Sequence, residues 1–130
     1  MCIRDSISTN SDYSVIAGGD FNRIFENITG GAILGGTSHE IYTNADYSVI
    51  AGGQNNLIGT NAQYAAIPGG QNNAATGSYS FAAGRRAKAI HDGAFVWADS
   101  TAADFSSTIA NEFRVRARGG VVLDLSLIHI

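Results

Sequence analysis

The chain has 130 residues and a formal net charge of −3 at pH 7, and 45% of its residues are hydrophobic. So mild a charge gives no basis for binding nucleic acid or an anionic lipid surface, and no apolar run approaches the ~18 residues that a membrane-spanning helix needs. Sixteen glycines beside one proline, in a chain this hydrophobic, favour many tight turns between short packed strands over a disordered linker. We therefore expect no nucleic-acid partner and no membrane contact for this segment.

The two ends differ in character from the rest of the sequence. The first six residues, MCIRDS, back-translate to ATG TGT ATA AGA GAC AG, and the last six, LSLIHI, back-translate to CTG TCT CTT ATA CAC ATC, its reverse complement over almost the whole length. The pair resembles a sequencing adapter read through at both ends of a DNA insert, so we expect 1–6 and 125–130 to be artefacts and 7–124 to be a native segment without its true termini. Cys2 is the only cysteine, so that segment has no disulfide and no cysteine metal site.

A 17-residue repeat dominates the native segment. The repeat is set by Gly19, Gly36, Gly53 and Gly70, whose positions differ by a constant 17 (36−19, 53−36, 70−53). Full-length rows begin at Tyr13, Gly30 and Tyr47, shorter 15-residue rows begin at Tyr64 and Tyr79, and a degenerate row begins at Ala94. Residues 7–93 therefore read as one array of repeats.

Columns of like residues accompany the glycines. The fourth column reads Ile16, Ile33, Ile50, Ile67 and Ala82, the twelfth reads Ile24, Ile41, Ile58, Ala75 and Ile90, and the tenth reads Asn22, His39, Asn56, Asn73 and Lys88. We predict that the isoleucines form two core ladders, in which each buried side chain contributes about 1.5–3 kcal/mol. Asn56 and Asn73 are predicted turn residues, because asparagine tolerates the left-handed conformation. The glycine pairs supply further turns, at Gly18, Gly19, Gly35, Gly36, Gly52, Gly53, Gly69 and Gly70.

Each row contains two short β-type runs separated by turns, which is the content of one coil of a narrow solenoid. Coils would stack at ~4.8 Å, each strand bonded to its equivalent in the next coil. No apolar stripe with a helical period persists along the rows, so a helical fold is excluded. The expected class is all-β: a parallel β-roll or β-solenoid of 15–17-residue coils, with a short β neck at the C-terminal end.

Strand alternation predicts apolar residues on both faces of each coil. In the row from Tyr47, Ser48 and Ile50 point to one face, whereas Tyr47, Val49 and Ala51 point to the other. The ladder on the second face reads Val15, Ala32, Val49, Ala66 and Phe81. Monomers rarely expose a long apolar strip, and closed symmetry buries one, so we expect more than one chain.

The segment 94–124 departs from the repeat. Phe95 and Trp97 are large for a narrow coil and are expected to plug its end. Further on, Phe113, Val115 and Ala117 alternate with Arg114, Arg116 and Arg118, which predicts a half-buried strand with an arginine stripe on its wet face. Gly119-Gly120 turns the chain, and 121–123 is expected to start another strand.

The rows resemble the YadA-like head repeats of trimeric autotransporter adhesins, whose motif reads roughly S-V-A-I-G, with a looser form S-x-A-x-G-x-x-A-x-A. Residues 80–89, SFAAGRRAKA, fit every fixed position, while SVIAG at 14–18 and 48–52 fits with the Ala and Ile columns exchanged. The resemblance covers about 7–93 and implies a left-handed parallel β-roll, a homotrimer, an extracellular location and adhesion to host or matrix surfaces. The 17-residue rows are longer than the coil that is usual in the family. Similar repeats also look like parts of phage tail fibres, where a purely structural spacer is the alternative.

No catalytic or metal site is indicated. His39 replaces an asparagine of the tenth column and His91 reads as a turn residue, while no row carries the glycine–aspartate pattern of calcium-binding repeats. The enzymatic alternative is a left-handed β-helix acyltransferase, but its six-residue spacing fails where Ile16 is followed by Asn22. No cofactor is expected.

Arg85, Arg86 and Lys88 form the densest basic patch. A solvated strand face is the ordinary interpretation, and an anionic glycan or matrix polyanion is the functional one. The function expected from the sequence is therefore that of a non-enzymatic adhesive or structural head segment, with a host surface protein or glycan as partner.

Overall fold

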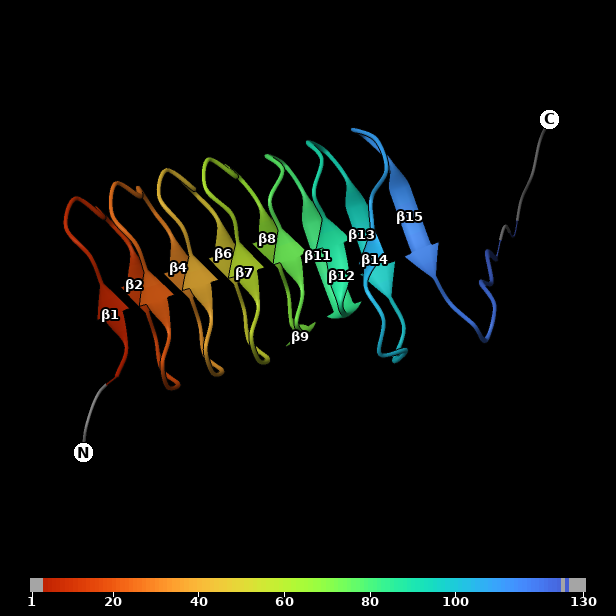
Figure 1. Cartoon of the computed structure of the whole chain (residues 1–130), viewed down its shortest axis with the longest axis horizontal. Helices are drawn as coiled ribbons and strands as arrows, with labels where there is room; N and C mark the ends of the chain where they lie inside the picture. The colour runs from red at the N-terminus through yellow and green to blue at the C-terminus, as the bar shows by residue number, and fades with distance from the viewer. Residues whose placement is uncertain (1–3, 125, 127–130) are drawn as a thin grey trace.

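The computed structural model describes residues 4–124 and residue 126. This part of the chain is all-β, with no helix, and winds into a parallel β-solenoid whose coils stack along one long axis (Figure 1). The predicted fold class is confirmed.

The coils carry two parallel sheets. The first sheet runs β1 (Ser6–Ile7), β3 (Arg23–Ile24), β5 (Glu40–Ile41), β7 (Leu57–Ile58), β10 (Ala74–Ala75), β12 (Ala87–Ala89) and β14 (Phe105–Ser106). The second runs β2 (Val15–Ile16), β4 (Ala32–Ile33), β6 (Val49–Ile50), β8 (Ala66–Ile67), β11 (Phe81–Arg85), β13 (Phe95–Ala98) and β15 (Phe113–Arg116), with β9 (Gly70–Gln71) also paired to β11. Each sheet therefore takes one strand from each coil.

The isoleucine columns lie inside the roll. Six of the seven predicted ladder residues are fully buried, namely Ile24, Ile33, Ile41, Ile50, Ile58 and Ile67, and Ile16 packs against them half-buried. In-register pairs join Ile16 to Ile33, Ile33 to Ile50, and Ile50 to Ile67 in successive strands. A further buried column at 17-residue spacing, Ile28, Ala45 and Ala62, belongs to the same core.

Coil length changes along the roll. Val49 pairs with Ala66, Ala66 with Phe81, Phe81 with Phe95, and Phe95 with Phe113, so the successive coil lengths are 17, 15, 14 and 18 (66−49, 81−66, 95−81, 113−95). The coil after Tyr79 is thus one residue shorter than its predicted row.

That shortening moves two predicted column members. Ala75 pairs with Ala89, and Ala74 pairs with Lys88. Lys88 therefore points outward from the eleventh column instead of occupying the tenth, and Ile90 lies beyond the twelfth, 47% exposed. A one-residue deletion inverts inside and outside for every residue that follows it on the strand.

Asn56 and Asn73 stabilise the roll from inside and are not the left-handed corner residues. Nδ2 of Asn56 donates at 3.0 Å to the carbonyls of both Gly52 and Gly70, and Oδ1 accepts the Asn73 backbone N–H at 3.0 Å. Each buried amide thus satisfies glycine carbonyls on two coils. The left-handed residues of this corner are the preceding ones, with φ of 55° at Asn55 and 58° at Asn72.

His39 occupies the asparagine column of the second full coil. Its Nδ1 accepts the Asn56 backbone N–H at 3.2 Å, whereas its Nε2 has no partner of good geometry among the described residues. Burial lowers the pKa of His39 below its ordinary value, although the backbone groups of Gly53 and Asn56 oppose the shift. The ring is a buried structural substitute for an amide.

Replacing His39 by asparagine is expected to stabilise the roll by about 1–2 kcal/mol, because the amide gains a partner that the ring Nε2 lacks. The folded pKa of His39 lies below its unfolded value, so the unfolded chain binds more protons and stability falls as pH drops below about 6.5. His39→Asn should remove this part of the pH dependence. Urea unfolding at about pH 5 and about pH 8 measures both effects, and an unchanged pH slope would contradict the assignment.

The expected neck strands belong to the roll, since β13, β14 and β15 extend the two sheets. The alternation predicted from Phe113 has the opposite phase: Phe113 is 73% exposed, and Arg114 pairs with Val96 of the buried column. Phe95 and Trp97 flank Val96, which is buried, so they point outward and do not plug the roll.

The remaining expectations concern the ends. No strand begins at 121–123, where all three side chains are exposed, and this segment extends away from the last coil (Figure 1). Residues 4–6 pack on the next coil, and a carboxylate oxygen of Asp5 accepts the Asn22 N–H at 2.7 Å. The other adapter-like residues, 1–3, 125 and 127–130, lie outside the described part of the chain, apart from residue 126, which is exposed.

Candidate functional site

The predicted basic patch separates into three different environments. Arg86 forms an ion pair with Asp104 at 2.8 Å, and it has a φ of 62°. Lys88 donates from Nζ to the Asn72 carbonyl, and its burial lowers the pKa of the ammonium. Arg85 alone is an exposed cation, so the patch does not act as one surface.

The arginines of the predicted stripe, Arg114 and Arg116, make their contacts within the last coil. Arg116 lies 3.1 Å from Asp99 and donates to the Ala103 carbonyl at 2.8 Å, while the Arg114 guanidinium sits 4.8 Å from the Phe105 ring centre. Hydrogen bonds to Asp99, led by the backbone N–H of Arg118, hold the pKa of that carboxyl well below its usual range. Arg114 and Arg116 thus cover the core at this end.

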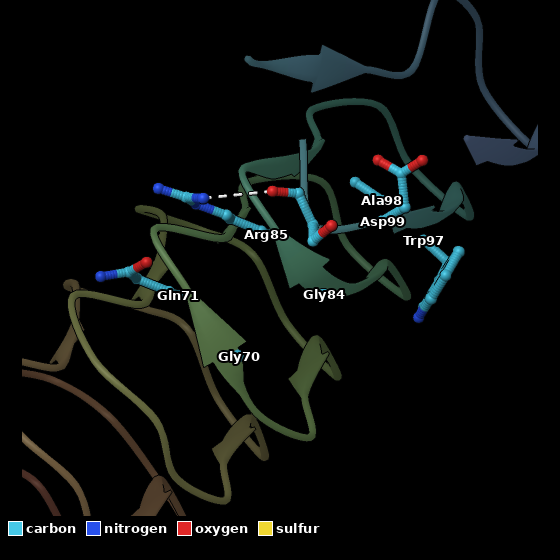
Figure 2. A pocket seen from close by; sticks show the side chains of 8 residues that line it. Gly70, Gln71, Gly84, Arg85, Trp97, Ala98 and Asp99 are labelled. Carbon is cyan, nitrogen blue, oxygen red and sulfur yellow. Dashed lines mark hydrogen bonds between the residues drawn. The ribbon is translucent and has the colours of Figure 1, made fainter. Parts of the chain in front are cut away.

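A pocket of about 350 Å³ opens at the glycine corner of the roll, beside the exposed cation. Its lining comes from three successive coils: Gly70, Gln71, Gly84, Arg85, Trp97, Ala98, Asp99 and Ser100. Figure 2 shows Gln71 and Arg85 projecting together from neighbouring coils, with the Trp97 ring on the other side of Gly84. The Arg85 guanidinium donates from one terminal nitrogen to the Ser100 carbonyl at 3.1 Å, which fixes its position.

Stacked aromatic rings follow the outer face of the second sheet. Tyr47 and Tyr64 stack at 5.4 Å, and Tyr64 and Tyr79 stack at 5.1 Å between ring centres. A second ladder joins Phe81, Phe95 and Phe113, with ring centres 4.4 and 4.6 Å apart. The three tyrosines are each about half-exposed or more. The tyrosines mark the row starts in the sequence, so their common column was the signal for this ladder.

One serine–histidine contact resembles the nucleophile–base pair of a hydrolase. Nδ1 of His91 lies 2.9 Å from Oγ of Ser107. However, Ser107 is only 3% exposed, and its Oγ already accepts the Ile90 backbone N–H at 3.0 Å. The pair is therefore a partly buried support for the adjoining turn.

Within the described residues, no three histidine, cysteine or acidic side chains are grouped so as to hold a metal ion. The same part of the chain contains no helix with the length and apolar character needed to cross a bilayer.

No protein family, curated protein or solved structure matches the chain. The class of the protein therefore follows from its fold and surface. It is a β-solenoid repeat protein with a filled core, an aromatic outer face and a pocket at one corner.

Proposed function

We propose that this chain is a non-enzymatic head segment of a surface adhesin or tail fibre, which works as a homotrimer and binds host or matrix surfaces. The observation that carries the proposal is the apolar outer face of the second sheet. The likeness of residues 80–89 to YadA-like head repeats supports three chains and an extracellular place; the physical argument alone supports more than one chain.

The outer face is apolar along the whole roll. Its third-column ladder runs through Val15, Ala32, Val49, Ala66, Phe81, Phe95 and Phe113. Val15 is 46% exposed and Phe113 is 73% exposed, and the stacked tyrosines border the ladder on one side. The core is already filled by isoleucines, so these residues have no interior left to enter. A cyclic assembly buries such a face without leaving a sticky surface.

Replacing Val49 by aspartate is expected to separate the oligomer into folded monomers. Val49 points outward at the middle of the apolar ladder, and symmetry would bring one carboxylate from each chain into the same interface. Light scattering at micromolar concentration measures the mass, and circular dichroism checks that the strands remain.

Leu57→Asp is the matched control, since Leu57 points outward from β7 on the opposite sheet of the same coil. It should leave the oligomer intact. A parent chain that is a stable, folded monomer at micromolar concentration would sink the homotrimer.

A further inference from the structure

The pocket at the glycine corner has a flat aromatic wall and an open mouth. Trp97 is 38% exposed and faces outward from β13. Backbone of Gly70, Gly84 and Ala98 lines the pocket between Trp97 and the polar side chains, which lets a flat ligand approach closely. A volume of about 350 Å³ lies at the small end of ligand sites, which suits one or two sugar rings better than a folded partner.

The pocket carries an uncompensated positive charge. Within the described part of the chain, no carboxylate lies in ion-pair distance of Arg85, whose guanidinium donates to the neutral Ser100 carbonyl. Asp99 also lines the pocket, but Arg116 at 3.1 Å and the Arg118 N–H at 2.9 Å neutralise its charge and occupy its oxygens. The remaining charge of the pocket favours an anion.

We infer that this pocket binds a carboxylate-bearing pyranose of an acidic saccharide. The C–H face of the sugar stacks on the Trp97 ring, whose electron-rich face attracts partly positive hydrogens. The sugar carboxylate pairs with the free N–H groups of Arg85, and the Gln71 amide bonds a ring hydroxyl. The inference rests on the proposed adhesive function and names its ligand class and its site.

Trp97 is the only tryptophan of the chain, so its fluorescence reports this pocket directly. Three probes separate the contributions: tetragalacturonate supplies a sugar face and a charge, galactotetraose supplies the face alone, and tetraglutamate supplies the charge alone. We expect tetragalacturonate to change the emission saturably, with weaker binding at high salt. The other two probes should bind at least about tenfold more weakly.

Arg85→Gln should weaken tetragalacturonate binding by about tenfold or more, because it removes the charge and keeps an amide near Ser100. Trp97→Ala should abolish binding measured by calorimetry. Gln63→Ala is the control, because Gln63 is an exposed glutamine that lies outside the pocket lining and whose side chain donates to Asp46. It should leave the affinity unchanged.

Three results would overturn the inference: no saturable change with tetragalacturonate, equal binding of tetraglutamate, or undiminished binding by Arg85→Gln. A blue shift of Trp97 emission with protein concentration alone would also overturn it, since a second chain would then fill the pocket. The first three results leave the mass measured by light scattering unchanged, so failure of the pocket and failure of the homotrimer are distinguishable.

Discussion

Replacing Ile50 by aspartate is expected to abolish folding of the roll. Ile50 is 0% exposed and lies in register between Ile33 and Ile67, so a carboxylate there would have apolar neighbours and no partner. Lost burial and an unpaired buried acid together cost about 4 kcal/mol or more. That approaches the whole stability of a domain at the lower end of the usual range, about 5–15 kcal/mol. Thermal melts followed by circular dichroism should show no cooperative transition.

Two control variants show whether the effect of Ile50→Asp comes from the loss of packing, from the charge, or from the face of the strand on which the charge lies. Ile50→Val keeps the core apolar and should cost only about 1 kcal/mol. Val49→Asp introduces the same charge one residue earlier, on the outer face, and should leave the monomer folded. Swapped outcomes for Val49→Asp and Ile50→Asp would mean that the faces of the strand are reversed.

The fold could be predicted because the repeat is regular over its first coils. Constant spacing from Gly19 to Gly70 places equivalent residues above one another, so the columns of isoleucine identify the interior without knowledge of the turns. Period alone carried this prediction, since a parallel solenoid pairs each residue with its own counterpart.

Spacing was uninformative where the coil length changes. Because the coil length falls from 17 to 15 and then to 14 residues after Val49, no fixed offset remains, and aligning Ile90 with Ile58 rested on residue type alone. The structure instead keeps Ala89 inside, because the shortest coil is narrower and encloses alanines such as Ala82 and Ala87.

Alternation likewise gives a strand but not its phase. Phe113 was expected to be inside because it is apolar, yet the last coil places Arg114 inward, over Phe105. An arginine can cover a core end with its stem and ring-stacking guanidinium. A tight hydrogen-bond network around Asp99 then fixes Arg116.

The pocket could be predicted only in part. Arg85 belonged to a visible basic cluster, but nothing in the sequence separated it from Arg86, whose partner Asp104 belongs to the next coil. Trp97 was assigned to the interior by its size. Its true place depends on the in-register pairing of β11 with β13, which brings Ala83 beside Trp97.

Replacing Gly53 by alanine is expected to destabilise the roll by about 3 kcal/mol or more. Gly53 has a φ of 95°, a conformation in which a side chain is strained. An added Cβ would also collide with the Gly70 carbonyl oxygen and lie 2.9 Å from Nδ2 of Asn56. That oxygen accepts both the Gln54 N–H and the Asn56 amide, so the clash would open the contact between two coils.

Gly52→Ala is the matched control, one residue earlier in the same pair. Gly52 has no left-handed φ, and an added Cβ there meets nothing within 4 Å. Its replacement should change the free energy of unfolding by no more than about 0.5 kcal/mol. Any change should be stabilising, because alanine gives the unfolded chain less conformational entropy than glycine does. Urea unfolding of the two variants measures the difference. Equal effects of the two variants would contradict the conclusion that the fold requires a glycine at Gly53 and not at Gly52.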